Sequence, residues 1–292
     1  MILLDGKKTA KEIKSELKDA IEKLIISGKK VPGLVAILVG NNPASEIYVN
    51  SKEKDCLEIG MKSVVEKLSE SISEKELLDL IDYYNKNKDI HGILVQLPLP
   101  EHINEDKIIE AISPQKDVDG FHPVSVGKLV IGKETFRACT PAGIQELLIR
   151  YNIDTKGKHV VVLGRSNIVG KPIANIMLQK KEHANSIVTI CHSAAPDISS
   201  YTKQADILVA AIGKPEFVKA DMVKEGVIVI DVGINRIEDT TLPKGYRIVG
   251  DVDFNEVSKK ASFITPVPGG VGLMTRAMLL KNNYNAYLKY GE

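Results

Sequence analysis

The stretch HVVVLGRSNIVGKP, residues 159–172, decides the fold of the second half of this 292-residue chain. Its apolar run from His159 to Leu163 predicts a strand that is buried on both faces of a parallel sheet. A glycine turn follows at once, and helical spacing continues from about Val169 to Lys180. The start of such a helix attracts phosphate through its free N–H groups and its positive dipole end. The stretch therefore indicates a nucleotide-binding strand, turn and helix.

The glycine spacing in this turn departs from the usual dinucleotide fingerprint. Gly164 and Gly170 are separated by five residues, so a GxGxxG motif is absent. Arg165 and Ser166 add a cation and a hydroxyl group that can contact phosphate. An ordinary strand-to-helix turn with a surface arginine remains the alternative interpretation, because such turns are common.

The elements that follow extend a dinucleotide-binding sheet and indicate its cofactor. We expect a short helix at 197–204 and further strands at 187–191, 207–212 and 227–232. An NAD-selective site places an acidic residue at the end of the second strand, to hold the ribose 2′-hydroxyl. This chain has His192 and Ser193 there, so a 2′-phosphate is admissible. We expect NADP, with NAD as the alternative, and Ser193 and Arg165 as candidate anchors.

The first half of the chain alternates strands and helices in the same way. Expected strands lie at 31–40, 62–68 and 92–97, and expected helices lie at 9–27, 44–60, 73–87 and 104–112. This order implies a parallel sheet whose ligands gather beyond the carboxyl ends of its strands. We therefore predict an α/β chain of two lobes, each a mostly parallel sheet with flanking helices. The second lobe is the Rossmann-type dinucleotide-binding domain.

The boundary between the lobes follows a basic segment from Val126 to Arg137. Thr140 and Pro141 predict the N-cap and the first-turn proline of a new helix. A last helix, from Leu273 to about Tyr290, is expected to pack back on the first lobe. The predicted domains are therefore residues 1–138 together with 273–292, and residues 139–272.

Tyr48 and Lys52 are expected one turn apart on the 44–60 helix. An ammonium group beside a phenol can hold an oxygen-rich substrate and, when it is partly removed from water, exchange its proton. An exposed lysine on a surface helix is the alternative. Gln96 offers an amide at the exit of the third strand, where it either binds a ligand or caps the strand. Asp117 and Asp119 are, by themselves, ordinary turn formers.

Composition excludes several classes of function. The net charge is +1 with acids and bases interspersed, so nucleic acid and membrane surfaces are not expected partners. The three cysteines are far apart and have no ligand spacing, which indicates reduced thiols and no metal site. The N-terminus lacks a signal-peptide pattern, and no segment approaches membrane-spanning length. We expect a cytoplasmic protein that acts on small molecules.

Six motifs, in unbroken order over nearly the whole chain, resemble the bifunctional methylenetetrahydrofolate dehydrogenase/cyclohydrolase family. They are YVNSK at 48–52, VQLPLP at 95–100, KDVDGFH at 116–122, GRSNIVGKP at 164–172, VIDVGIN at 229–235 and TPVPGGVG at 265–272. The resemblance implies a folate cleft between the first lobe and an NADP lobe. It also implies a homodimer and a role in the one-carbon metabolism that supports purine biosynthesis.

The resemblance also implies roles for particular residues. Lys52 becomes the central cyclohydrolase residue, with Tyr48 lining the folate, Gln96 tuning Lys52, and Asp119 holding the amino and amide edge of the pterin. Further implied folate contacts are Val95, Leu97, Pro268, Gly269 and Gly270. Implied NADP contacts are Gly164, Arg165, Ser166, Ser193 and Ile234.

The implied chemistry suits these residue types. Removal of hydride from the methylene carbon leaves a cation shared by two folate nitrogens, so this step needs orientation rather than a strong base. Water must then add to that carbon, which requires proton movement and suits a lysine. The expected products are 5,10-methenyltetrahydrofolate and then 10-formyltetrahydrofolate.

Three residues depart from the family pattern, namely Ala138, Ala195 and Leu273. Ala195 replaces a threonine and can weaken a cofactor hydrogen bond, which bears on the choice of NADP. Two rival functions fit the sequence less well. A short-chain dehydrogenase also uses a Tyr and a Lys four apart, but its nucleotide turn precedes that pair. A nucleotide sensor without turnover is disfavoured because Tyr48, Lys52, Gln96 and Asp119 are all present.

Overall fold

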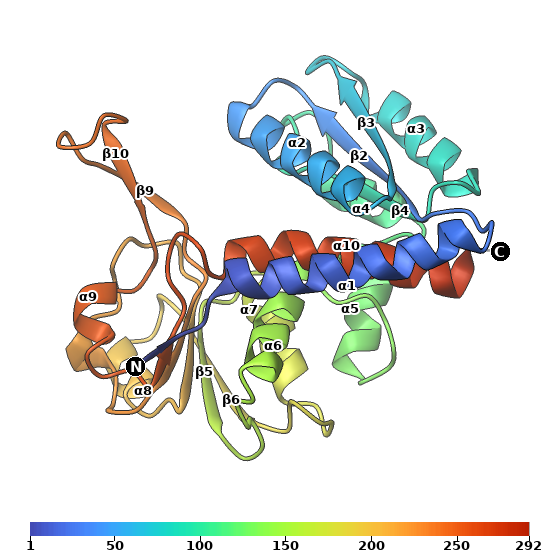
Figure 1. Cartoon of the computed structure of the whole chain (residues 1–292). Coiled ribbons are helices and arrows are strands. Elements are labelled where there is room, and N and C mark those ends of the chain that lie inside the picture. Colours follow the sequence, from blue (N-terminus) through green and yellow to red (C-terminus); the bar gives the residue numbers. More distant parts are fainter. Residues whose placement is uncertain (292) are drawn as a thin grey trace. The chain divides into compact units, whose positions relative to one another are not determined.

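The computed structural model describes residues 1–291, which divide into two compact units. The three-stranded unit contains Lys11–Cys139 and the chain from Arg276 onward, and the six-stranded unit contains Met1–Ala10 and Thr140–Thr275. Each unit has its own sheet with helices around it (Figure 1). The chain is therefore α/β with two lobes, as the alternation of strands and helices predicts. Among the described residues, no helix is both long and apolar enough to cross a membrane.

The sheet of the three-stranded unit has the order β3-β2-β4, and both pairings are parallel, as predicted. Its strands are β2 (Gly33–Val39), β3 (Lys62–Leu68) and β4 (Gly92–Val95). Every residue of the central strand β2 is buried. Helix α2 (Pro43–Glu58) packs on β2 and β3, and α3 (Glu74–Lys86) contacts β4 (Figure 1). Leu77 and Ile81 of α3 enter the core, whereas Leu78 is half-buried.

The other helices of this unit are α4 (Glu105–Ala111), α5 (Pro123–Val130) and most of α1 (Gly6–Ile26) and α10 (Val271–Tyr290). Helix α5 was not predicted, because we interpreted the chain from Val126 as an irregular basic segment. Pro123 opens this helix, and the ring of His122 caps it by accepting a 3.0 Å hydrogen bond from the Val124 amide. Gly127 obscures its helical pattern in the sequence.

The C-terminal helix packs on the three-stranded unit from Arg276 onward, as predicted. The Asn282 side chain donates to the carbonyl oxygens of Val118, at 2.8 Å, and Arg137, at 3.1 Å. Farther along, the ring of Tyr287 meets the ring of His91 edge to face. These contacts fix α10 against the segment that carries Asp119.

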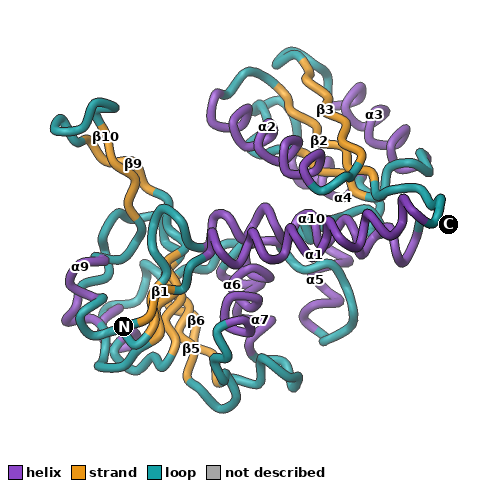
Figure 2. Tube along the Cα trace, in the orientation of Figure 1, coloured by secondary structure: helices purple, strands orange, loops and turns teal. Residues whose placement is uncertain are grey.

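The sheet of the six-stranded unit has the order β1-β11-β8-β7-β5-β6 and is parallel throughout. Figure 2 shows its strands in orange, around the labels β1, β5 and β6. Its strands are β1 (Ile2–Leu3), β5 (His159–Leu163), β6 (Ile187–Cys191), β7 (Ile207–Ala210), β8 (Ile228–Asp231) and β11 (Phe263–Ile264). Strands β1 and β11 were not predicted, since two residues are too few to show a period. The four predicted strands all form, so the Rossmann-type sheet is confirmed.

The remaining elements surround or extend this sheet. They are the helices α6 (Cys139–Arg150), α7 (Gly170–Met177), α8 (Ile198–Thr202) and α9 (Phe254–Val257), a 3₁₀ turn (Ala220–Met222), and the strands β9 (Asn235–Glu238) and β10 (Tyr246–Val249). Strands β9 and β10 form an antiparallel ribbon that extends away from the sheet (Figure 1). Helix α6 begins at Cys139, so the predicted N-cap at Thr140 is wrong. The Thr140 hydroxyl instead bonds the Thr275 hydroxyl at 2.8 Å.

Candidate functional site

Helix α2 positions Lys52, and a strong cap fixes where this helix begins. The Asn42 side chain accepts hydrogen bonds from the amides of Ala44, at 3.0 Å, and Ser45, at 3.1 Å. Pro43 occupies the first helical turn, where a missing N–H group costs nothing. The helix predicted over 44–60 therefore begins at Pro43, with Asn42 as its N-cap. Tyr48 and Lys52 follow one turn apart, as predicted.

Lys52 and Gln96 are in direct contact although 44 residues separate them. The Lys52 ammonium donates a 3.1 Å hydrogen bond to Gln96 Oε1. Gln96 Nε2 donates to the Leu97 carbonyl at 2.7 Å, and the Gln96 backbone amide is bonded to β2. Because the amide nitrogen already faces a carbonyl oxygen, the oxygen must face Lys52. The structure thus brings together two of the predicted residues and fixes the orientation of both.

Asp119 lies in the same electrostatic neighbourhood. Burial raises the pKa of this carboxyl group, and the nearby Lys52 ammonium partly opposes that rise. The Cys139 thiol lies 3.7 Å from Asp119 Oδ1 and 3.4 Å from the Val118 carbonyl oxygen. Burial holds the pKa of Cys139 well above its ordinary value, so the thiol keeps its proton and donates. A half-buried carboxyl group therefore lies within the electrostatic range of the Lys52 amine.

Asp117, which precedes this carboxyl group by two residues, has a structural role. Its oxygens accept hydrogen bonds from the backbone amides of Phe121, at 3.1 Å, and His122, at 3.0 Å. Burial raises its pKa to about 6, against a hydrogen bond from Ser125 that lowers it. Asp117 is thus the turn former that the sequence indicates, and it shapes the loop that carries Asp119.

Tyr48 and Val95 differ sharply in exposure. The Tyr48 side chain is 45 % exposed, so its ring is open to a ligand. Val95 is 7 % exposed and belongs to the apolar core. Sequence reasoning missed Cys139 and Asn282, whose contacts with the Asp119 segment come from distant elements. Thr140 and Pro141, which directly follow Cys139, indicate a helix start and are the local sequence feature that draws attention to this position.

Gly164 follows β5 and lies at the carboxyl edge of the six-stranded sheet. Its φ is +127°, and a Cβ atom there would lie 2.1 Å from the Ala211 carbonyl oxygen. Only glycine fits this close approach of two loops. The Gly164 amide is bonded to the Cys191 carbonyl oxygen at 2.8 Å, so β5 and β6 stay paired up to the turn. The turn is therefore a rigid cradle at the start of α7.

Ser166 and Arg165 occupy this turn differently. Ser166 Oγ accepts hydrogen bonds from the amides of Val169, at 3.1 Å, and Gly170, at 3.3 Å, and so caps α7. Its hydroxyl proton remains available to an anion. Arg165 is exposed at the same edge. The helix start can thus receive phosphate through a hydroxyl group and a guanidinium group as well as through its dipole.

The other predicted cofactor residues follow neighbouring strands at this edge. Strand β6 ends at Cys191 and is followed by His192 and the exposed Ser193, with no carboxylate between them. Ile234 follows β8, is 54 % exposed, and would touch a Cβ atom at Gly272. Because carboxyl ends of parallel strands share one edge, Gly164, Ser193 and Ile234 lie along the same side of the sheet.

The Pro268–Gly270 loop belongs to the six-stranded unit and is anchored to the start of α1. The Lys7 amide donates a 3.0 Å hydrogen bond to the Gly269 carbonyl oxygen. The backbone of Gly270 approaches Gly6 so closely that a Cβ atom on Gly6 would lie 2.0 Å from the Gly270 oxygen. These contacts hold the loop in one conformation, so it can present a fixed wall to a ligand.

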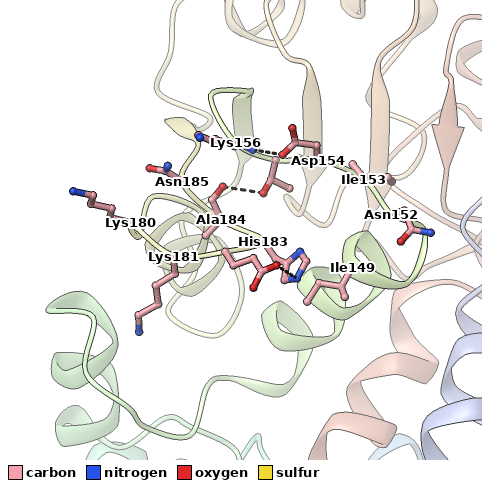
Figure 3. Close-up of a pocket in the computed structure, with 12 residues that line it drawn as sticks. Ile149, Asn152, Ile153, Asp154, Lys156, Lys180, Lys181, His183, Ala184 and Asn185 are labelled. Carbon is pink, nitrogen blue, oxygen red and sulfur yellow. Dashed lines mark hydrogen bonds and ion pairs between the residues drawn. The ribbon is translucent and has the colours of Figure 1, made fainter.

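A hollow of about 550 Å³ lies at the opposite edge of the six-stranded sheet (Figure 3). The loops that precede β5 and β6 line it, including Asn152–Lys156 and Lys180–Asn185. Within these loops, the Thr155 hydroxyl donates to the Ala184 carbonyl oxygen at 2.8 Å. Ligands of parallel sheets bind beyond the carboxyl ends of the strands. This hollow faces the amino ends, so we do not assign the cofactor to it.

Comparison with known proteins covers both units. A family model described as the tetrahydrofolate dehydrogenase/cyclohydrolase catalytic domain matches residues 4–119, and its NAD(P)-binding counterpart matches residues 138–290. The curated bifunctional protein FolD of Chloroherpeton thalassium is 59 % identical over 289 residues, 98 % of each chain.

Solved structures agree with this match. The bifunctional enzyme FolD of Campylobacter jejuni is 52 % identical, covers 99 % of each chain, and has a TM-score of 0.93. A Trypanosoma brucei methylenetetrahydrofolate dehydrogenase-cyclohydrolase, solved with NADP cofactor and inhibitor, is 37 % identical with a TM-score of 0.93. That comparison covers 99 % of this chain and 98 % of the other.

Proposed function

Because the chain belongs to the tetrahydrofolate dehydrogenase/cyclohydrolase family, we propose that it performs two consecutive reactions of one-carbon metabolism. It oxidises 5,10-methylenetetrahydrofolate with NADP to 5,10-methenyltetrahydrofolate. It then hydrolyses this product to 10-formyltetrahydrofolate. The observation that carries the proposal is the hydrogen bond between Lys52 and Gln96, near the half-buried carboxyl group of Asp119.

The residues at the carboxyl edge of the six-stranded sheet fit NADP. Gly164 lets the turn after β5 pack against the Ala211 backbone, where a Cβ atom would clash, and Ser193 stands where an NAD site has a carboxylate. Bound NADP supplies the nicotinamide that accepts the hydride. We assign the cofactor contacts to Gly164, Arg165, Ser166, Ser193 and Ile234. Their task is orientation, since loss of the hydride needs no strong base.

Lys52 performs the proton transfers of the hydrolytic step. Its uncharged amine takes a proton from the water that attacks the methenyl carbon, as the new C–O bond forms. The resulting ammonium returns that proton to the folate nitrogen whose C–N bond breaks, and the hydroxyl group left on the carbon releases its own proton to water as the formyl C=O forms. Gln96 Oε1 accepts a hydrogen bond from the Lys52 nitrogen and aims it, because its own amide nitrogen is tied to Leu97.

The remaining assignments concern folate binding. Asp119 accepts hydrogen bonds from the amino and amide edge of the pterin, and paired donors on one carboxyl group make such bonds strong. Tyr48 stacks its exposed ring along the substrate. Further contacts come from Val95, Leu97, Pro268, Gly269 and Gly270. We assign folate binding mainly to residues 1–138 with 273–292 and cofactor binding to residues 139–272, except that Met1–Ala10, which contains β1, belongs to the six-stranded unit.

Absorbance measurements with the purified protein and methylenetetrahydrofolate test this function. Reduced nicotinamide and the methenyl compound are followed together, with NADP or NAD as the oxidant. We expect reduction with NADP and faster loss of the methenyl compound than without protein. The Lys52→Ala variant should lose hydrolysis and keep part of the oxidation. Undiminished hydrolysis in this variant contradicts the role of Lys52, and no reduction with either oxidant contradicts the function.

We further propose a cytoplasmic homodimer. Three buried cysteines without disulfides suit a reducing compartment. Strand β6 is an edge of the sheet, and Ile187 and Ile190, on its opposite faces, are both exposed, so a second copy can cover this edge. Light scattering on the eluted protein measures the assembly directly, and a monomer at micromolar concentration would contradict the dimer.

A further inference from the structure

Arg276, on α10, holds the turn of α2 that contains Lys52. Its Nε lies 2.6 Å and its Nη2 2.5 Å from Asp55 Oδ2. Nη2 also donates a 3.2 Å hydrogen bond to the Ser51 carbonyl oxygen. Ser51 and Asp55 are the two ends of one helical turn, and Lys52 lies between them. One guanidinium group therefore binds the backbone and a side chain on both sides of Lys52.

A second cation completes this contact from α1. The Lys14 ammonium lies 3.1 Å from Asp55 Oδ1 and 2.6 Å from Glu58 Oε2. The Asp55 side chain is 6 % exposed, so its charge is compensated in a poorly solvated place. Two cations and two carboxylates make the cluster electrically neutral. Both Asp55 oxygens are occupied, one by each cation.

We infer that Arg276 and Asp55 are positioning residues for Lys52 in the hydrolytic step. The Arg276 guanidinium and the Asp55 carboxylate fix the rotation and height of the α2 turn that presents the lysine to Gln96. A shift of about 1 Å in a reacting group can cost on the order of 100-fold in rate. A surface ion pair would contribute little, but this pair is partly buried, charge-assisted and joined to the backbone.

The pair also places charged groups near Lys52. Asp55 lies three residues beyond Lys52 on the same helix, within the range of side-chain interaction. Without Arg276, the Asp55 carboxylate would hold the proton on the Lys52 ammonium more tightly. Without Asp55, the cations Arg276 and Lys14 would favour the uncharged amine. Four other groups interact with the Lys52 side chain, namely Cys56 on its own helix, Gln96 after β4, Asp119 between α4 and α5, and Cys139 at the start of α6. Besides these and Asp55, the titratable residues closest to it along α2 are Tyr48, Glu53 and Lys54.

The test measures kcat for hydrolysis of 5,10-methenyltetrahydrofolate against pH, together with kcat for oxidation. Arg276→Met should lower hydrolytic kcat about tenfold and oxidation less than about threefold. It should move the acidic limb of the hydrolytic profile up by about half a pH unit, because hydrolysis needs the uncharged amine. Asp55→Asn should move the limb down by a similar amount.

Two more variants separate position from charge. The double variant Asp55→Asn/Arg276→Met should return the acidic limb to the position of the parent, because both charges are removed. Its hydrolytic kcat should stay low, because the hydrogen bond from Arg276 to the Ser51 carbonyl oxygen is still missing. Arg276→Lys keeps the charge and should restore the limb and part of kcat, although lysine lacks the planar fork. Arg150→Met is the matched control. Arg150 is also ion-paired, to Glu146 at 2.9 Å, and its side chain is 22 % exposed against 24 % for Arg276.

The outcomes are distinct. The inference is supported when the acidic limb of the hydrolytic pH profile moves in opposite directions for Arg276→Met and Asp55→Asn. The Arg150→Met control should leave that limb unmoved. The inference is overturned when Arg276→Met leaves the acidic limb unmoved and either keeps the hydrolytic kcat within about twofold of the parent or lowers hydrolysis and oxidation equally. The inference rests on the proposed function. A parent protein without hydrolytic activity overturns that function, and this inference with it, before any variant is compared.

Discussion

The backbone amide of Asp251 donates a 2.8 Å hydrogen bond to Oδ1 of Asp231, and both carboxyl groups are buried. Asp231 also accepts from the amides of Gly233, at 3.0 Å, and Val252, at 3.0 Å. Asp251 in turn accepts from the amides of Ile212 and Gly213 and from the side chain of Asn235. The two aspartates thus join the loops that follow β7, β8 and β10, beneath the proposed cofactor edge.

This buried pair predicts a pH dependence of stability. Burial raises the pKa of Asp231 to about 7, above the ordinary value of 3.8. Between these two pH values the folded protein keeps a proton that the unfolded chain releases, so Asp231 lowers the free energy of unfolding as pH rises through this window. Asp231→Asn should flatten that slope. It should also cost about 1–3 kcal/mol, because an amide cannot accept all three N–H donors.

Urea unfolding of the parent and of Asp231→Asn at pH 5 and pH 7 checks this prediction. His91 is a background group with the opposite slope, since burial lowers its pKa, and it is present in both proteins. The difference between the two slopes therefore isolates Asp231. An identical slope in both proteins would show that Asp231 does not hold its proton in this window.

Gly92 lies so close to Asn283 that a side chain added at residue 92 should lower the free energy of unfolding. A Cβ atom at Gly92 would lie 2.5 Å from Asn283 Oδ1 and 2.7 Å from a methyl group of Val118. Gly92→Ala should therefore lower the free energy of unfolding by about 1–3 kcal/mol, through overpacking between β4 and α10. Urea unfolding followed by circular dichroism measures it. Gly127→Ala is the control, because Gly127 is helical and has open space around it. That variant should be neutral or gain up to about 1 kcal/mol.

How far the sequence predicts this molecule depends on how local each signal is. The run from Gly33 to Val39 and the run from His159 to Leu163 are continuous apolar segments, and both form the expected strands. Strands β1 and β11 exist because two short segments pair with the sheet, and no local pattern reveals them. Helix α5 is hidden because its capping residue is a histidine and its interior contains Gly127.

The same distinction between local and long-range signals applies to the residues of the candidate site. The spacing of Tyr48 and Lys52 on one helix face is local, and the sequence predicts it. The approach of Gln96 to Lys52 bridges 44 residues, so only the family resemblance could indicate it. The contacts of Cys139 with Asp119, and of Arg276 with Asp55, are tertiary and charge-dependent. No spacing in the sequence predicts them.

The close approach of Gly164 to Ala211 predicts a selective loss of cofactor binding. Gly164→Ala places a Cβ atom 2.1 Å from the Ala211 carbonyl oxygen, at a φ that side chains rarely adopt. The loop must move, so the KM for NADP should rise about tenfold or more, while hydrolysis of the methenyl compound stays within about twofold. Gly157→Ala is the control, because Gly157 also has positive φ but lies in open space before β5. A KM for NADP equal to that of the parent would contradict the cradle.

The residue after His192 predicts the choice between NADP and NAD. Ser193 is exposed beyond the end of β6, where a carboxylate would repel a 2′-phosphate and accept a hydrogen bond from a 2′-hydroxyl. Ser193→Asp should lower kcat/KM for NADP by about 10- to 100-fold and raise the ratio of NAD to NADP activity. Ser193→Asn has nearly the same shape without the charge, so it should lose much less NADP activity. Initial rates with each oxidant, at low and high salt, measure the effect, and salt should reduce the penalty in the aspartate variant only. Equal losses in the aspartate and asparagine variants would mean that charge at residue 193 does not select the cofactor.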